Sequence, residues 1–177
     1  MNSPREQGGR SPRRRWTETV LLFVVARQEF AIAADSVQEI RSTDGLAGAA
    51  SEIEQPVLPK VRHTIERGHR TYYVVNAGAH FGLPVSRPAL VLILRQSRVA
   101  VLIDRIERMT EISALYPLPL AYTGEERRWY RGLAYLDDMV IPVVHPGGFL
   151  TAEDFEHLDR AAKPNASERH MEGAVPA

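Results

Sequence analysis

Short apolar runs separated by turn residues recur through the body of the chain. They are rich in β-branched and aromatic side chains, which favour strands; examples are Val20–Ala26, Tyr72–Val75, Ala89–Leu94 and Val99–Ile103. None of them approaches the ~20 apolar residues that a membrane-spanning helix requires. Strands this short, with a turn signal about every 8–12 residues, are typical of small β-barrels or a β-sandwich.

Polar turns between these runs predict hairpins. Arg27-Gln28-Glu29 follows the first run, and Arg95–Arg98 separates Ala89–Leu94 from Val99–Ile103. Asp137-Asp138 joins Gly132–Leu136 to Met139–Val144. Pro142 has no N–H, so the last strand is expected at a sheet edge, or with Pro142 where no ladder donor is needed. Long connections are predicted at Asp44–Lys60 and at the proline-rich segment Leu115–Tyr122.

The two ends of the chain differ from its body. Residues 1–16 are rich in Arg, Ser, Pro and Gly, which indicates a disordered basic leader, and residues 163–177 are expected to form a loose tail. Thr151 and Asp154 have the spacing of a capping box, with Phe155 and Leu158 as a narrow apolar stripe. A C-terminal helix is therefore predicted to open at Thr151.

Composition excludes several classes of function. The chain has no cysteine, so disulfides, thiolate nucleophiles and cysteine–zinc sites are excluded. Its six histidines show no close metal-binding spacing, and no phosphate loop or nucleophile elbow is present. A net charge of zero gives no overall attraction to nucleic acid. We expect no metal, no cofactor and no enzymatic activity.

Ser36–Arg41 shows a different period. Val37 and Ile40 lie three residues apart, which predicts one helical turn that buries both side chains and leaves Gln38, Glu39 and Arg41 facing water.

Four segments in order carry a resemblance to a known family. They are the first strand–turn–strand unit with Val37-Gln38-Glu39-Ile40, then Arg67-Gly68 to Phe81-Gly82-Leu83-Pro84, then Val99–Asp104 with Ile106 and Met109–Ile112, and finally Tyr130–Asp138. Together, from about Thr19 to Phe155, they resemble the CheW-like coupling domain of bacterial chemotaxis. The chain departs from the family pattern at Ile65-Glu66 and Asn76-Ala77-Gly78.

The resemblance implies a mainly β fold of two packed five-stranded SH3-like β-barrels with short helices and a C-terminal helix. Both barrels would lie in one domain at residues 17–158, the first at about 17–84 and the second at about 85–150. It also implies a non-enzymatic cytoplasmic adaptor at membrane-associated receptor clusters, in chemotaxis or a related pathway such as twitching motility. Its partners would be a CheA-type histidine kinase and the cytoplasmic tip of a methyl-accepting chemoreceptor.

The family's receptor-docking face maps onto five residues. Glu39 and Arg67 occupy its acid and its loop arginine, while Val37, Ile106 and Met109 are candidates to line the groove between the barrels. Surface solvation competes with this role for the two charges, and core packing competes for the three apolar side chains.

Other readings stay open for some features. The stretch Glu125–Tyr130 is either a second protein contact or a charged loop followed by core aromatics. For the whole chain, the alternatives are a diverged small-barrel interaction module outside chemotaxis and a nucleic-acid-binding barrel with the arginine leader as its arm.

Overall fold

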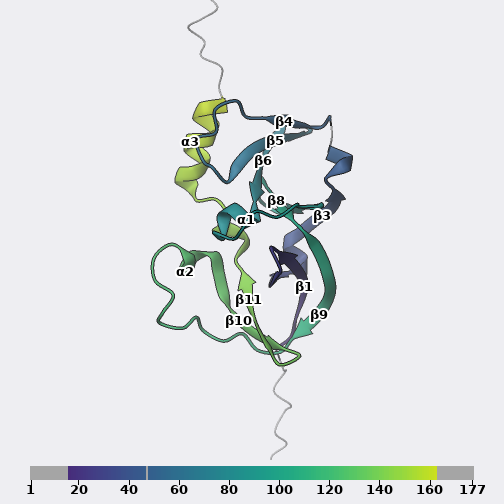
Figure 1. The fold of residues 1–177 in the computed structure, drawn as a ribbon, viewed down its shortest axis with the longest axis vertical. Helices are drawn as coiled ribbons and strands as arrows, with labels where there is room; N and C mark the ends of the chain where they lie inside the picture. The colour runs from purple at the N-terminus through teal and green to yellow at the C-terminus, as the bar shows by residue number, and fades with distance from the viewer. Residues whose placement is uncertain (1–15, 47, 163–177) are drawn as a thin grey trace, which may run out of the picture.

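Eleven strands in two sheets form the body of the protein, as seen in a computed structural model that describes residues 16–46 and 48–162 (Figure 1). The five-stranded sheet has the order β10-β11-β2-β1-β9, from β1 (Glu18–Val25), β2 (Gln28–Ala33), β9 (Arg105–Ile112), β10 (Tyr130–Leu136) and β11 (Met139–Val144). The six-stranded sheet has the order β3-β7-β8-β6-β5-β4, from β3 (Val37–Ser42), β4 (Ala50–Glu52), β5 (Val61–Arg67), β6 (Arg70–Asn76), β7 (Leu90–Leu94) and β8 (Val99–Ile103). The fold class is mainly β, as predicted.

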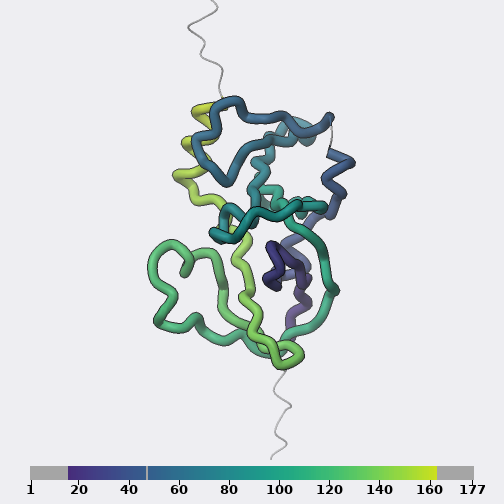
Figure 2. Tube along the Cα trace, viewed as in Figure 1, coloured from purple at the N-terminus to yellow at the C-terminus, as the bar shows by residue number. Residues whose placement is uncertain are grey.

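The sequence placed the barrels at about residues 17–84 and 85–150 and left open which strands each of them takes. The six-stranded sheet takes β3 to β8, whereas the five-stranded sheet combines the first two strands with the last three. The chain therefore passes between sheets after β2, returns after β8, and passes again after β11 (Figure 2). The sixth strand is β4, which lies in the segment expected to be a long loop.

Three apolar clusters explain why several strands read as continuous hydrophobic runs. Val20, Leu22 and Ile141 belong to a cluster of the five-stranded sheet, and Ile65 and Ile93 to one of the six-stranded sheet. A third cluster joins residues of both sheets, such as Phe23, Phe30, Leu92, Val101 and Ile103. Strands β1, β2, β6, β7 and β8 are therefore buried on both faces, and alternation disappears from their sequences.

The predicted helical turn at Val37–Ile40 is wrong. Val37–Ser42 forms strand β3, and the short 3₁₀ turn η1 (Ala34–Ser36) lies just before it. The register of β3 against β7 shifts between Val37 and Glu39, so that Val37 opposes Leu94 and Ile40 opposes Leu92. This bulge places two residues three apart on the same face of a strand, which reproduces the spacing of a helical turn.

The hairpins predicted around Arg95–Arg98 and Asp137-Asp138 are confirmed as β7–β8 and β10–β11. Asp137 and Asp138 have φ of +48° and +63°, as in the primed turns that suit tight hairpins. The first turn lies slightly earlier than expected, at Ala26-Arg27.

Strand β11 is not at an edge, so the second of the two expectations for Pro142 applies. Leu133, which opposes Pro142, exchanges both backbone hydrogen bonds with Tyr116 on its other side. Leu133 and Pro142 therefore form a non-hydrogen-bonded pair, and the nitrogen of Pro142 faces β2. The ladder between β11 and β2 begins only at Val143, so no donor is required at Pro142.

The three α-helices gather on one side of the two sheets, on the left of Figure 1. They are α1 (Ala77–His80), α2 (Glu126–Trp129) and α3 (Ala152–Ala162); the chain also has the short 3₁₀ turns η2 (Asp44–Leu46), which follows β3 on the right, and η3 (Pro146–Gly148). The predicted capping box is present, because Thr151 N donates to Asp154 Oδ2 at 2.9 Å and Asp154 N donates to Thr151 Oγ1 at 3.1 Å. Leu158 is buried and Phe155 packs against the cluster shared by the sheets.

Candidate interaction site on the edge strands

Each sheet ends in an edge strand that carries apolar side chains. In both strands these side chains lie on the face that points toward the other sheet. Strand β3 ends the six-stranded sheet, and β9 ends the five-stranded sheet; both lie on the right of Figure 1. On β3, Val37 and Ile40 oppose residues of the cluster shared by the two sheets. On β9, Ile106 opposes Phe23 and Met109 opposes Leu21, which belong to the same cluster.

These four side chains, here called the edge-strand face, differ in exposure. Val37 and Ile106 are half-buried and pack against the shared cluster. Ile40 is 44% exposed and Met109 is 60% exposed. Ile40 and Met109 are thus the exposed members of this face, and Val37 and Ile106 are its half-buried members. Sequence reasoning missed Ile40 because it took the residue as the buried side of a helical turn.

Glu39 does not face open water as expected from the sequence. The bulge turns it opposite Ile93, and its side chain is 31% exposed. Its carboxylate lies between two guanidinium groups: Arg41 Nε donates to Oε1, and Arg67 Nη2 lies 2.6 Å from Oε2. The hydrogen bond from Arg41 lowers the pKa of Glu39, and the charge of Arg67 adds to this effect against partial desolvation. Glu39 is therefore held as a carboxylate.

The Glu39–Arg67 pair joins strands that are not neighbours. In the six-stranded sheet, β3 is one end and β5 is next to the other end, so the pair spans the seam between the two ends. Arg67 lies beside the β5–β6 turn, where Gly68 has φ of +60°, and its guanidinium is 5.9 Å from the ring centre of Tyr72. Its Nη1 is buried without a hydrogen-bond partner. The structure thus brings Glu39 and Arg67 together as an ion pair.

Ion pairs close the five-stranded sheet in the same way. Arg131 on β10 contacts Glu18 on β1 at 2.9 Å, and Arg108 on β9 contacts Asp137 in the β10–β11 turn. In each sheet, charged pairs thus connect strands at or next to the opposite ends of the strand order.

Comparisons with known proteins agree with this geometry. The family model for the CheW-like domain matches residues 19–154. The chain belongs to the CheW-like domain family. The crystal structure of the scaffolding protein TtCheW from Thermoanaerobacter tengcongensis superimposes with a TM-score of 0.61 at 16% identity, covering 73% of this chain and 90% of that one. Comparison with curated proteins found no match.

Membership of the CheW-like family assigns the chain to scaffold and adaptor proteins of chemotaxis signal transduction. The edge-strand face and the Glu39–Arg67 pair contain all five residues that the resemblance marked as receptor contacts. Within the described residues, no helix is long and apolar enough to cross a membrane. The same part of the chain has no group of three or more acidic or histidine side chains placed to hold a metal ion.

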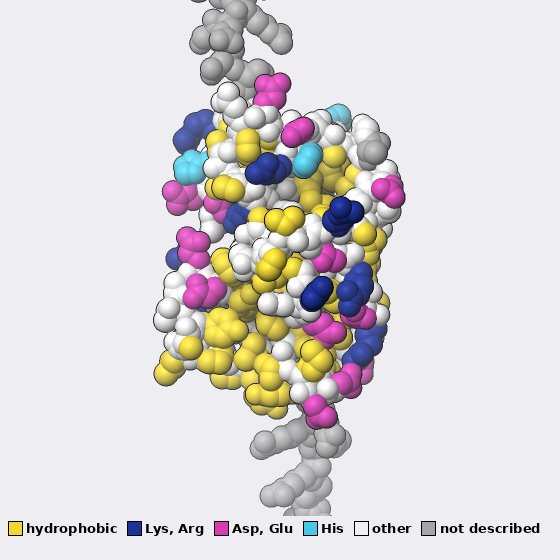
Figure 3. Space-filling view, in the orientation of Figure 1, with side chains coloured by type: hydrophobic (Ala, Val, Ile, Leu, Met, Phe, Trp, Pro, Cys, Tyr) yellow, Lys and Arg dark blue, Asp and Glu magenta, His cyan; other side chains and the backbone are white. Residues whose placement is uncertain are grey.

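A second apolar surface lies on the β10–β11 hairpin and the segment before it. Leu120 is 90% exposed, and Tyr116, Tyr135, Met139 and Val140 are each about half exposed. The rings of Tyr116 and Tyr135 meet edge to face at 4.7 Å. Figure 3 shows hydrophobic side chains gathered over the lower part of the molecule, where Figure 1 places β10 and β11. We call these five residues the hairpin face.

The aromatics of Glu125–Tyr130 take part in packing between the sheets. The ring of Tyr130 stacks on Phe81 at 5.8 Å, and Trp129 lies 4.6 Å from the ring of His80. Glu125, Arg127 and Arg128 are exposed. Of the two interpretations of this stretch, the structure favours a charged loop followed by core aromatics.

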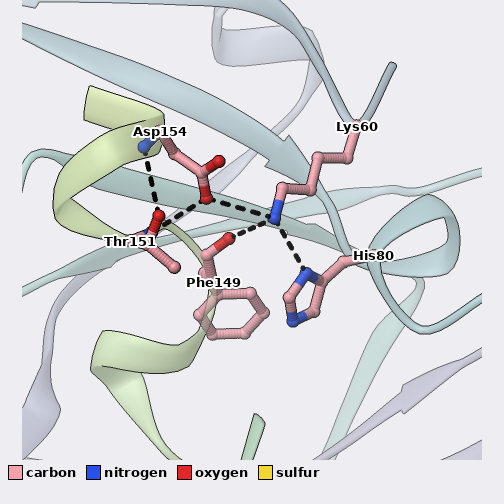
Figure 4. A network of polar contacts seen from close by, with 5 residues as sticks. All are labelled: Lys60, His80, Phe149, Thr151 and Asp154. Carbon is pink, nitrogen blue, oxygen red and sulfur yellow. Dashed lines mark hydrogen bonds and ion pairs between the residues drawn. The ribbon is translucent and has the colours of Figure 1, made fainter. Parts of the chain in front are cut away.

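Opposite the edge-strand face, a polar network ties the helices to the six-stranded sheet (Figure 4). Lys60 Nζ donates to the carbonyl oxygen of Phe149 at 2.8 Å and lies 3.5 Å from His80 Nδ1 and 3.7 Å from Asp154 Oδ2. His80 is buried among aromatic rings, and its Nε2 has no hydrogen-bond partner. Burial, reinforced by the charge of Lys60, lowers the pKa of His80 to about 3. The imidazole is therefore neutral at physiological pH.

Proposed function

We propose that this protein is a non-enzymatic adaptor that couples a chemoreceptor to a CheA-type histidine kinase. The observation that carries the proposal is the edge-strand face, where Ile40 and Met109 are exposed beside a charged cluster. An apolar strip with charges at its rim suits a partner helix, because apolar contact supplies affinity and the charges fix register. The cytoplasmic tip of a methyl-accepting chemoreceptor is the partner expected for this face.

The kinase is proposed to bind the hairpin face. Tyr135, Tyr116 and Met139 supply the large, rigid or adaptable apolar side chains that are favoured at interface centres. The hairpin face lies within residues 85–150, the second barrel expected from the sequence, and we assign this part of the chain to the kinase's regulatory domain. In this proposal the protein works by position: it holds the kinase where a conformational change in the receptor can reach it.

An adaptor of this kind acts in the cytoplasm beside receptor clusters, without chemistry of its own. The titratable groups support that role. Glu39 is engaged by two arginines, and neutral His80 lies in a packing cluster, so neither resembles a general base poised beside a nucleophile.

The test is a binding assay with separate variants on the two faces. The tagged protein is used to capture partners from lysate of its own organism, as wild type and as Ile40→Ser and Tyr135→Ser. We expect a histidine kinase and a chemoreceptor to co-purify with the wild type. The Ile40→Ser variant should lose the receptor and retain the kinase, and Tyr135→Ser should do the reverse, so each variant is the control for the other.

Charge variants then test the cluster next to the edge-strand face. Arg67→Glu places two carboxylates against each other and should weaken receptor capture while the kinase remains bound. Capture of neither partner by the wild type would contradict the coupling role. The remaining interpretation would then be a protein-interaction module that acts outside chemotaxis. Loss of both partners in every variant would contradict the division into two faces.

A further inference from the structure

A cleft of about 870 Å³ lies where segments of the two sheets meet, and one of its lining residues, Arg95, donates a hydrogen bond to the carbonyl oxygen of Val37. Its walls come from η1, the β7–β8 turn, the start of β6 and η3. Its apolar floor includes Val99, Leu150 and Phe155. None of the residues of the edge-strand face or of the hairpin face lines it.

Three of the thirteen residues that line this cleft are arginines. Arg70, Arg95 and Arg98 line it, whereas Asp35 is its only lining carboxylate in the described part of the chain. Arg98 is neutralised by Asp159, with two hydrogen bonds of 2.8 Å. Arg70 and Arg95 form no ion pair within residues 16–46 and 48–162, so their charges are uncompensated by a direct partner.

Several of these donors are held in place before any ligand arrives. Arg95 Nε donates to the carbonyl oxygen of Asp35 at 2.9 Å, which fixes the guanidinium at the edge of the cleft. Arg98 lies 4.9 Å from the ring centre of Phe155. His145 Nδ1 accepts a hydrogen bond from Gly147 N at 2.9 Å, so the proton of the neutral ring is on Nε2, which is then a donor. Fixed donors lose little conformational entropy on binding.

We infer that this cleft binds an acidic peptide segment of a partner protein. Arginines bind carboxylates with charge-assisted hydrogen bonds, often through two parallel contacts. The donors come from separate elements and are spread around an open cleft with an apolar floor. That arrangement suits an extended chain with successive carboxylates better than a single small anion. The inference is independent of the proposed receptor and kinase faces, because the cleft shares no residue with them.

The test measures binding of an end-capped hexaglutamate peptide to the full-length protein by calorimetry at low salt, with a hexaglutamine peptide as the uncharged ligand. Arg70 is exposed and accepts substitution without loss of packing. We expect Arg70→Gln to weaken hexaglutamate binding about fivefold, and Arg70→Gln with Arg95→Gln to weaken it further. Arg87→Gln is the matched control, because Arg87 is exposed but does not line the cleft. The arginines of residues 1–16 are present in every variant, so their contribution cancels.

Backbone amide shifts locate the peptide on the wild-type protein without any substitution. Binding in the cleft should shift the amides of Gln96, Ser97 and Gly147. The inference is overturned if these amides do not move, if Arg70→Gln and Arg87→Gln bind equally well, or if hexaglutamine binds as tightly as hexaglutamate. Tighter binding of ATP or inorganic phosphate than of the peptide would also overturn it, because the cleft would then be a small-anion site.

Discussion

At the scale of single residues, the protonation and contacts of a titratable side chain depend more on its position in the fold than on its chemical type. Glu39 looks like a solvated surface acid in the sequence, yet the structure pairs it with Arg41 and Arg67. His80 looks like one histidine among six, yet it is buried beside a lysine and three aromatic rings. The Glu39–Arg67 pair and the contacts of His80 with Lys60, Trp129 and Phe149 join segments far apart in the chain, so no local sequence pattern predicts them.

Burial of His80 makes stability depend on pH. Its pKa in the folded state is about 3, against an ordinary value of 6.5, so below pH 6.5 the unfolded chain binds a proton that the folded chain does not. The free energy of unfolding should therefore fall as pH drops from about 6.5 toward about 3. Since one pKa unit corresponds to about 1.4 kcal/mol, this group alone should remove about 2 kcal/mol between pH 7 and pH 5.

Urea unfolding at pH 7 and pH 5 measures that effect. In His80→Phe the titrating group is gone and an aromatic ring remains, so the variant should lose about 2 kcal/mol less than the wild type over the same interval. His157→Gln, on the exposed side of α3, is the control and should follow the wild type. Equal losses in the wild type and His80→Phe would show that His80 does not control the acid response.

At the scale of elements, the sequence predicts most where the relevant signal is local. The β7–β8 and β10–β11 hairpins follow from apolar runs and turn residues, and the start of α3 follows from its capping box. The prediction failed at β3, because a bulge and a helical turn give the same three-residue spacing. It also missed β4, a three-residue edge strand with the sequence Ala-Ser-Glu, whose pairing with β5 depends on tertiary context.

The capping box of α3 gives a prediction at this scale. Thr151→Ala removes the acceptor for Asp154 N and should lower the free energy of unfolding by about 1 kcal/mol. Thr151→Ser keeps the hydroxyl and should stay within a few tenths of a kcal/mol of the wild type. Thermal or urea unfolding of both variants measures the difference. Equal stability of the Ala and Ser variants would mean that packing of Phe155 and Leu158, rather than the cap, fixes the start of the helix.

At the scale of the whole molecule, the architecture is set by the order in which strands join the two sheets more than by any single strand. A division near residue 84 is the simplest arrangement for two barrels, but the chain instead builds one sheet from its middle and the other from its two ends. Sequence alone does not show this, because the alternation of apolar residues reports burial and not the partner of a strand. The same arrangement, in which the chain leaves the first sheet and later returns to it, places β3 and β9 at the edges that form the edge-strand face.

Because the chain passes from one sheet to the other and back, we also predict that the two sheets unfold together. The five-stranded sheet cannot form until the chain beyond the six-stranded sheet has returned, and the largest apolar cluster contains residues of both. Leu92→Ala removes a fully buried side chain from that cluster and should lower the free energy of unfolding by about 2–5 kcal/mol.

Hydrogen exchange should show that loss equally at Ala100 in β8 and Ala134 in β10, as expected for one cooperative unit. Val85→Ala, at a fully exposed side chain, should leave both amides unchanged. Faster exchange in the six-stranded sheet alone would mean that the sheets are separate units, and that a receptor bound at the edge-strand face would have to hold them together.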